Sequence, residues 1–338
     1  MVTTNTKVVY VSKRQIKKKK MFTVTLNNGL KCPIIGLGTC TYTDNQELVA
    51  KSVREAIDAG YRHIDSAFIY HNEEEVGSAI REKIAEGAVK REELFITTKL
   101  WNTSHKEGQV VPACKLSLKN LGLDYVDLFL MHWPTAYTYD GVHHYHTVDA
   151  NGKSLIENTD YLETWRGMEE CVRLGLTKSI GVSNCNSEQV GRILSVAKIK
   201  PVINQVECHI NLNQKKLRSF CEERGVKITA HSPLGSPKRS WAKPGDHQVS
   251  LKHPVILKIA KKYKKTPAQV IIRFMIDNGI IVIPKSSSKN RIIENIQVFD
   301  FHLSLEEINE IDKLDMGARI CPALQRNDHP DYPFNIEF

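Results

Sequence analysis

Eight short apolar runs are separated by longer segments in which apolar residues recur at helical spacing. In residues 47–59, for example, Leu48, Val49, Val53, Ala56 and Ile57 fall on one face. Similar segments cover residues 73–84, 105–121, 161–174, 213–223 and 267–278. The short runs have the length of strands and cover residues 34–37, 63–65, 94–98, 126–131, 179–182, 202–206, 226–230 and 280–283. The pattern predicts strands that alternate with helices.

This alternation predicts a parallel sheet, because each parallel crossover needs an intervening helix. Eight such units without a linker at the midpoint favour a closed (β/α)8 TIM barrel, an α/β fold, over a doubly wound sheet. Residues 22–33 predict an N-terminal β-hairpin around the Asn28-Gly29 turn. Long insertions at 135–158 and 233–253 follow strand ends, where barrel active sites are built. We expect the proline-containing tail, residues 316–338, to lie over the mouth of the barrel.

The net charge of +9 first suggests a nucleic-acid partner. Seven of the positive charges lie in the first 20 residues, which contain no acid, so the rest of the chain carries only +2. We therefore expect residues 1–21 to be a basic, disordered arm, with a nuclear-localisation or polyanion-binding patch as the alternative. Residues 22–338 form one barrel domain in this prediction, and no nucleic acid is expected to bind.

The apolar runs are too short to cross a bilayer, and the N-terminal arm lacks the apolar core of a secretory signal. The eight cysteines are scattered, without C-x-x-C or zinc-finger spacing. In a long chain without a signal sequence, these features indicate reduced thiols. We therefore expect a cytoplasmic protein that does not enter membranes, and we expect it to be a monomer.

Two common phosphate-binding motifs are missing from the sequence. The glycine-rich turn at Gly36 and Gly38 lacks the third glycine of the dinucleotide-binding fingerprint, and no suitable acid follows about 20 residues later. The chain also has no G-x-x-x-x-G-K-[ST] segment. A Rossmann site and P-loop phosphoryl transfer are both disfavoured.

Four polar residues instead follow consecutive strands. Asp65, Lys99 and His132 come at strand ends, and Tyr70 lies in the loop five residues after Asp65. Taken singly, each has an ordinary structural explanation: a helix cap, an extended lysine, a core histidine and a packing tyrosine. In a barrel, however, all four converge on one mouth.

Together the four residues can donate a proton to an oxygen that gains negative charge. Hydride transfer to a carbonyl produces such an oxygen. A free tyrosine, with a pKa of about 10, is a weak acid at neutral pH, but a nearby ammonium favours the phenolate. In this interpretation Tyr70 is the acid, Lys99 activates it, Asp65 holds Lys99, and His132 hydrogen-bonds the substrate oxygen.

Several longer segments resemble signatures of the aldo-keto reductase superfamily. The first runs from Gly60 to Ala67 and continues through Tyr70, Glu73 and Gly77. The others are Gly181-Val182-Ser183-Asn184 and Ile283-Pro284-Lys285-Ser286, with further similarity at 204–209, 232–236 and 331–334. The resemblance extends from about residue 22 to 338. It implies NADPH-dependent reduction of aldehydes or ketones to alcohols in an aldose or aldehyde reductase-like barrel.

The resemblance also implies where NADPH binds. Ser183, Asn184 and Gln205 match residues that hold the nicotinamide carboxamide, and Lys285, Ser286, Arg291, Glu294 and Asn295 match the adenosine site. The sequence adds that a helix start after Lys285 attracts phosphate, and that Lys285 and Arg291 favour NADP over NAD. The full set expected to bind the cofactor is Gly38, Thr39, Asp65, Ser183, Asn184, Gln205, His231, Ser232, Leu234, Ser236, Lys285, Ser286, Ser287, Arg291, Glu294 and Asn295. The residues expected to contact substrate are Tyr70, His132, Trp133 and Trp101.

Three positions depart from the family pattern. His231 stands where a tyrosine usually stacks on the nicotinamide, Cys40 where a tryptophan is common, and Cys185 where an aromatic usually follows Ser-Asn. These changes concern cofactor affinity and pocket shape and leave the reaction type unaffected. The natural substrate stays open among sugar aldehydes, lipid aldehydes and steroid-like ketones.

Other functions remain as alternatives. A catalytically silent barrel, like the channel β-subunits and lens crystallins that resemble this family, is disfavoured because all four catalytic positions are filled. Reduction of a conjugated C=C bond is disfavoured by His132, since relatives with that activity carry an acid there. The histidines at 143–146 form a metal-like cluster, but without a fixed set of supporting ligands we expect no metal site.

Overall fold

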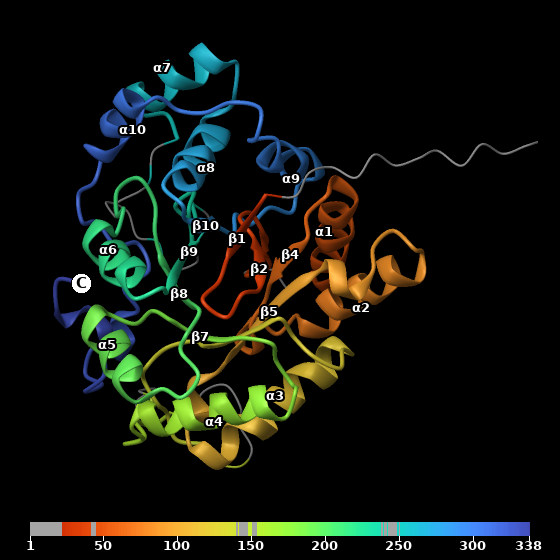
Figure 1. Ribbon diagram of the computed structural model, residues 1–338, viewed down its shortest axis with the longest axis vertical. Coiled ribbons are helices and arrows are strands. Elements are labelled where there is room, and N and C mark those ends of the chain that lie inside the picture. Colours follow the sequence, from red (N-terminus) through yellow and green to blue (C-terminus); the bar gives the residue numbers. More distant parts are fainter. Residues whose placement is uncertain are drawn as a thin grey trace, which may run out of the picture.

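The computed structural model describes residues 22–41, 45–139, 141, 148–150, 154–237, 239, 242, 249 and 251–338. Eight parallel strands form one sheet in chain order, surrounded by helices (Figure 1). The strands are β3 (Leu37–Gly38), β4 (His63–Asp65), β5 (Phe95–Leu100), β6 (Leu128–Met131), β7 (Ile180–Ser183), β8 (Ile203–Glu207), β9 (Lys227–His231) and β10 (Ile281–Val282).

The first and last strands of this sheet meet and close it into a ring. Ile35 pairs with Val282 and Gly38 pairs with Lys285 in parallel bridges. The backbone N–H of Gly36 donates to the Val282 carbonyl at 2.8 Å. The (β/α)8 barrel predicted from the sequence is therefore confirmed.

Most helices lie between consecutive strands, and several start at residues that cap them well. Thr266 caps α8, with Pro267 in the first turn and Gln269 completing a reciprocal capping box. The helices are α1 (Gln46–Ala59), α2 (Glu73–Ala85), α3 (Glu107–Leu121), α4 (Tyr161–Arg173), α5 (Ser187–Val196), α6 (Lys215–Glu223), α7 (Pro254–Tyr263), α8 (Pro267–Asp277), α9 (Lys289–Ile296) and α10 (Leu305–Asp312). The apolar periodicity did not single out α5, α7 or α10.

Several strands end one or two residues later than the apolar runs predicted. β5 continues to Leu100 and therefore includes Lys99, while β7, β8 and β9 end at Ser183, Glu207 and His231. Backbone pairing in a ladder does not depend on side-chain polarity, so the strands run on into the polar residues at the barrel mouth. The site residues are thus held by rigid strand backbone.

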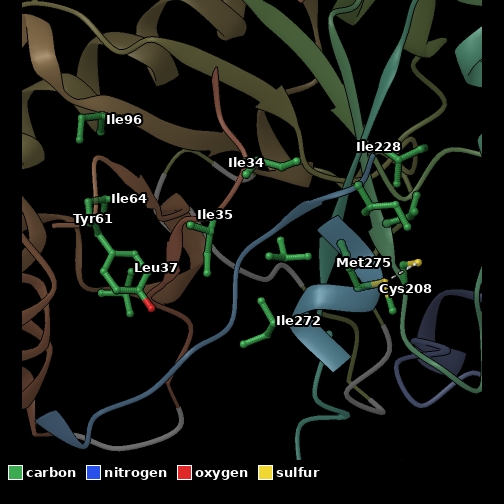
Figure 2. Packing of buried hydrophobic residues seen from close by; sticks show 14 of the residues in the cluster. Ile34, Ile35, Leu37, Tyr61, Ile64, Ile96, Cys208, Ile228, Ile272 and Met275 are labelled. Atoms are coloured by element: carbon green, nitrogen blue, oxygen red, sulfur yellow. Dashed lines mark hydrogen bonds between the residues drawn. The ribbon is translucent and has the colours of Figure 1, made fainter. Parts of the chain in front are cut away.

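The core packs between the barrel and its helices. Figure 2 shows Leu37 and Ile64, from adjacent strands, near the ring of Tyr61, and Met275 of α8 beside Cys208. The Cys208 and Met275 sulfur atoms are 3.9 Å apart, and both residues are fully buried. This packing fixes the outer helices against the strands.

The predicted N-terminal hairpin consists of β1 (Thr23–Thr25) and β2 (Lys31–Pro33) and lies across the ring in Figure 1. Leu26 and Cys32 are buried and pack with residues that point into the barrel, among them Phe95, Leu128 and Ile203. Asn27 donates to the carbonyl of Pro201, two residues before β8. The hairpin therefore plugs the N-terminal end and leaves the opposite end for a site.

Among the described residues, no helix is long and apolar enough to cross a bilayer. The arm at 1–21 and the histidines at 143–146 lie outside the described residues.

Candidate active site

A cavity of about 450 Å³ opens at the C-terminal ends of the strands. It runs from Tyr70 and His132 to the segment before α9. Most residues predicted from the sequence line it: Gly38, Thr39, Asp65, Tyr70, His132, Trp133, Asn184, Gln205, His231, Ser232, Leu234, Ser236, Lys285, Ser286, Ser287, Arg291, Glu294 and Asn295. The barrel thus brings residues from distant parts of the chain to one hollow.

A buried ion pair lies at the floor of this cavity. Lys99 Nζ is 2.5 Å from Asp65 Oδ1 and also donates to the carbonyl of Ser66 at 2.7 Å. Both side chains are almost completely buried, so water does not weaken their attraction. Gln205 Nε2 donates to the other Asp65 oxygen at 2.7 Å. The carboxylate is therefore held from two sides and fixes the ammonium.

Tyr70 ends the short 3-10 turn η1 (Phe68–Tyr70), which returns its side chain to the strand ends. The phenol oxygen is 3.4 Å from Lys99 Nζ, and the Tyr70 ring meets the His132 ring edge-on with centroids 5.8 Å apart. Ammonium, phenol and imidazole are thus contiguous at the cavity wall.

His132 follows β6 and is buried. Burial and the cationic Lys99 hold the pKa of this imidazole well below its usual range, with smaller contributions from Arg326 and His231. Nδ1 is sealed without a hydrogen-bond partner among the described residues. A neutral ring suits His132 to hydrogen-bond an uncharged carbonyl.

An amide cluster lies next to these groups. Asn184 has a left-handed backbone (φ 57°), and its Nδ2 donates to the His132 carbonyl at 2.9 Å and to Ser183 Oγ at 3.1 Å. Ser183 Oγ in turn donates to the carbonyl of Gln205 at 2.8 Å. Both Asn184 and Gln205 face the cavity with orientations fixed by these bonds. They can hold a planar amide ligand.

His231, at the end of β9, lies against this cluster. Its Nε2 is 3.2 Å from Asn184 Oδ1, and its Nδ1 is 3.2 Å from Ser232 Oγ. Burial lowers the pKa of His231 to about 4, so the ring is neutral at physiological pH. An imidazole held at both nitrogens presents a fixed, uncharged ring to the cavity.

The far end of the cavity is cationic and polar. Lys285, Ser286 and Ser287 connect β10 to the start of α9, and Arg291 lies in the first turn of that helix. Glu294 accepts a hydrogen bond from Thr266 Oγ1 at 2.8 Å, which orients its carboxylate. Helix-start amides and two cations are groups that can hold phosphate oxygens.

Three predicted residues do not line the cavity. Lys99 and Ser183 lie behind Tyr70 and Asn184 and are hydrogen-bonded to them. Trp101 is buried against His132, with ring centroids 5.5 Å apart, and so supports the wall from behind.

The structure also places five residues at the cavity that the sequence did not single out individually: Pro237, Arg239, Leu251, Ala268 and Cys321. Pro237, Arg239 and Leu251 belong to the insertion at 233–253, whose position after a strand end was a signal. Cys321 comes from the C-terminal tail. Its side chain carries no motif that marks it in the sequence.

The tail lies over the mouth as predicted and is anchored through its backbone. Glu207, at the end of β8, accepts from the N–H groups of Ile320 (2.6 Å) and Cys321 (2.9 Å). Near the start of α5, Asn186 and Gln189 donate to the carbonyls of residues 333 and 331. Both elements belong to the barrel, so the tail has a fixed position above the cavity.

Comparison with known proteins gives a consistent result. The profile of the Aldo/keto reductase family matches residues 34–316. The chain belongs to this family. It is 47% identical to mouse aldo-keto reductase family 1 member D1 over 321 residues, which covers 93% of this chain and 97% of the relative. It is 45% identical to chicken family 1 member A1 over 322 residues, 92% and 97% of the two chains.

Solved structures of other aldo-keto reductases superpose on nearly the whole chain. The Bombyx mori aldo-keto reductase in complex with NADP gives a TM-score of 0.84 at 42% identity and covers 93% of this chain and 99% of its own. The Schistosoma japonicum aldose reductase gives 0.87 at 40% identity, covering 94% and 100%. This aldo-keto reductase is therefore an NADP-dependent oxidoreductase of the carbonyl-reducing type.

Proposed function

We propose that this aldo-keto reductase reduces aldehydes or ketones to alcohols with Tyr70 as proton donor, supported by Lys99, Asp65 and His132. The observation that carries the proposal is the continuous contact from Asp65 through Lys99 Nζ to the Tyr70 phenol at the cavity wall. NADPH-dependent turnover of a simple aldehyde such as benzaldehyde tests it. A pure enzyme that consumes no NADPH with any aldehyde or ketone would instead support the alternative, a catalytically weak barrel.

The cavity fits an extended dinucleotide. Its polar lining provides amides near the proposed catalytic residues and cations at the opposite end. The sequence lacks the glycine-rich fingerprint of a Rossmann site. Ser183, Asn184, Gln205 and His231 would hold the nicotinamide end. Lys285, Ser286, Ser287, Arg291, Glu294 and Asn295 would hold the adenosine end, with Gly38, Thr39, Asp65, Ser232, Leu234 and Ser236 along the path between them.

NADPH, when bound, supplies the hydride to the carbonyl carbon. His132 and Tyr70 hydrogen-bond the carbonyl oxygen, which orients the substrate against Trp133. As negative charge grows on that oxygen, the phenol proton of Tyr70 moves to it. Lys99 stabilises the resulting phenolate, and Asp65 keeps Lys99 in position. Trp101 acts behind His132, and the tail shields the cavity from water.

The remaining assignments rest on sequence features. We propose that residues 22–338 form a single catalytic unit, preceded by a basic arm at 1–21. The enzyme acts as a monomer on small carbonyl compounds. In this proposal it binds no nucleic acid, membrane or metal. No disulfide joins the eight cysteines, all of which lie in the described part of the chain, and this suits a reducing compartment such as the cytoplasm. A panel of sugar aldehydes, lipid aldehydes and steroid-like ketones, assayed with NADPH, would identify the substrate class.

Lys285→Met should weaken NADPH binding much more than NADH binding. Lys285 lies at the cationic end of the cavity, where a 2′-phosphate requires positive charge. We expect KM for NADPH to rise by about tenfold or more while KM for NADH changes little, since a charge-assisted contact is worth roughly 1.5–3 kcal/mol. Steady-state kinetics with both cofactors measure this. Equal KM values for NADPH and NADH in the unmodified enzyme would contradict the assignment.

His231→Tyr should tighten NADP⁺ binding. A phenol ring offers more stacking area than imidazole, and aromatic pairs contribute about 0.5–1.5 kcal/mol, so Kd should fall by a few-fold to about tenfold. Titration of tryptophan fluorescence with NADP⁺ gives Kd. The ratio of NADP⁺ to NAD⁺ affinity should stay unchanged, because the adenosine end is not altered. Unchanged Kd would mean that residue 231 does not face the nicotinamide ring.

A further inference from the structure

The turn that carries Tyr70 is short and lies at the edge of the core. The 3-10 turn η1 has three residues, none of which is buried, and it closes on a backbone bond from the Tyr70 N–H to the Ala67 carbonyl at 3.0 Å. His71, the next residue, has a left-handed backbone (φ 52°), which residues other than glycine seldom adopt. Burial alone therefore does not set the position of the Tyr70 phenol, and the anchoring of the turn at its ends becomes important.

Asn72 lies at the far end of this turn, at the N-cap position of α2, and is only 1% exposed. An asparagine at such a position usually accepts a hydrogen bond from a backbone N–H of the first helical turn. The side chain of Asn72 makes no capping bond of this kind. The first turn of α2 instead contains three acids at 73–75, which suit the positive end of the helix dipole. The buried Asn72 amide serves other contacts.

This amide bridges the ends of two strands. Its Nδ2 donates to the carbonyl of Thr39, directly after β3, at 3.0 Å, and its Oδ1 accepts from Oγ of Ser66, directly after β4, at 3.1 Å. Both partners are buried, so water cannot easily replace either bond. The two bonds need one donor and one acceptor on the same short side chain, which asparagine supplies and an ionised aspartate does not.

The two bridged residues also hold the buried ion pair. The carbonyl of Ser66 accepts from Lys99 Nζ at 2.7 Å. The N–H and Oγ1 of Thr39 both donate to the backbone carbonyl of Asp65 at 3.0 Å. The Asn72 amide therefore ties the end of η1 to the same backbone segments that hold the carboxylate and the ammonium.

We propose that Asn72 is a positioning residue for carbonyl reduction: by bridging the ends of β3 and β4 it fixes the turn η1, so that the Tyr70 phenol stays against Lys99 Nζ. This inference rests on the proposed function, because Asn72 acts through the phenol oxygen. That oxygen is 3.4 Å from Nζ, at the long end of the hydrogen-bond range, so a small displacement breaks the contact. A misplacement of about 1 Å can cost roughly 10² in rate.

Asn72→Ala removes both bonds without changing a residue that lines the cavity. In single-turnover reduction of benzaldehyde with NADPH, we expect the rate of hydride transfer to fall by about 10- to 100-fold, because the phenol is no longer held at Lys99. Kd for NADPH should change by less than about twofold, since Thr39 keeps its own bonds to Asp65. An unchanged rate would overturn the inference.

Asn213 offers a matched control, because it is also 1% exposed and also uses both ends of its amide. Its Nδ2 donates to Asp312 Oδ1 at 3.1 Å, and its Oδ1 accepts from the Lys215 N–H at 3.2 Å. It lies outside the cavity lining. Asn213→Ala should lower Tm to a similar extent as Asn72→Ala but leave the rate within about twofold. An equal loss of rate in both variants would show that buried amides only support the fold.

A double variant separates positioning from a general loss of structure. If Asn72 acts through the phenol oxygen, Asn72→Ala should change the residual rate of a Tyr70→Phe enzyme by less than about twofold, because that oxygen is already absent. A fall by the same factor in both backgrounds would overturn the inference. Retention of the full rate by Tyr70→Phe itself would instead count against the proposed function.

Crystal structures of the variants test the geometry without turnover. In Asn72→Ala, the distance from the Tyr70 phenol oxygen to Lys99 Nζ should lengthen beyond hydrogen-bond range, to about 4 Å or more. Ser66→Ala is a milder variant that removes only one of the two bonds and keeps the backbone carbonyl for Lys99, so we expect a smaller displacement and a rate that falls only a few-fold. An unchanged distance in both variants would overturn the inference, even if the rates fall.

Discussion

Tyr70→Phe is expected to lower kcat for carbonyl reduction by a factor of roughly 10²–10⁴, the usual contribution of general acid–base catalysis. The substitution removes only the phenol oxygen that lies 3.4 Å from Lys99 Nζ. The ring keeps its edge-on contact with His132, so the cavity and cofactor site should persist. Single-turnover kinetics with benzaldehyde, under conditions where chemistry limits turnover, measure the effect.

Cofactor affinity provides the control for Tyr70→Phe, because Kd for NADPH should change by less than about twofold if the fold is intact. Tyr139→Phe is the matched variant, since it removes a phenol oxygen from a residue outside the cavity lining and should leave kcat unchanged. A Tyr70→Phe enzyme with near-normal kcat would assign proton donation to His132.

Lys99→Met should damage both catalysis and stability. The substitution removes the cation that stabilises the Tyr70 phenolate and leaves the Asp65 carboxylate buried with only the Gln205 amide as a neutral partner. Breaking a buried pair in this way costs about 3–5 kcal/mol. We expect the free energy of unfolding to fall by about that amount and kcat to fall by at least about 10². Urea denaturation and single-turnover kinetics give the two values.

The double variant Asp65→Asn with Lys99→Met separates the two effects. It removes the unpaired, buried carboxylate of residue 65, so much of the free energy of unfolding should return. The Tyr70 phenolate still lacks its cation, so kcat should stay low. A double variant as unstable as Lys99→Met alone would show that the loss comes from packing rather than from an unpaired charge. An unchanged kcat in either variant would show that Lys99 is not needed for catalysis.

The barrel and much of its site were predictable from the sequence because both depend on local pattern and chain order. Alternating apolar runs indicated eight βα units, and parallel strands in a ring necessarily bring their C-terminal ends together. That rule alone predicts that Asp65, Lys99 and His132 lie together at one end of the barrel. The apolar runs did not predict the exact strand ends, because backbone pairing between the strands continues into polar residues such as Ser183 and Glu207.

The parts that the sequence did not reveal depend on contacts distant along the chain. The anchoring of the tail by Glu207 comes from hydrogen bonds to backbone groups more than 100 residues further along the chain. No periodicity or spacing encodes such a contact. The hydrogen bond between His231 and Asn184 likewise appears only once β9 and β7 lie in one ring.

The anchors of the tail have a consequence for how this enzyme can diverge. Glu207, Asn186 and Gln189 all bind backbone atoms of the tail, so these anchors do not depend on the side chains at 320, 321, 331 and 333. The exposed residues 324, 325, 327 and 328 are therefore free to vary without loss of these anchors, whereas Arg326 is buried against Trp101 and Trp133. Exchange of these exposed residues, in natural evolution or in directed libraries, would leave the tail in its place above the cavity.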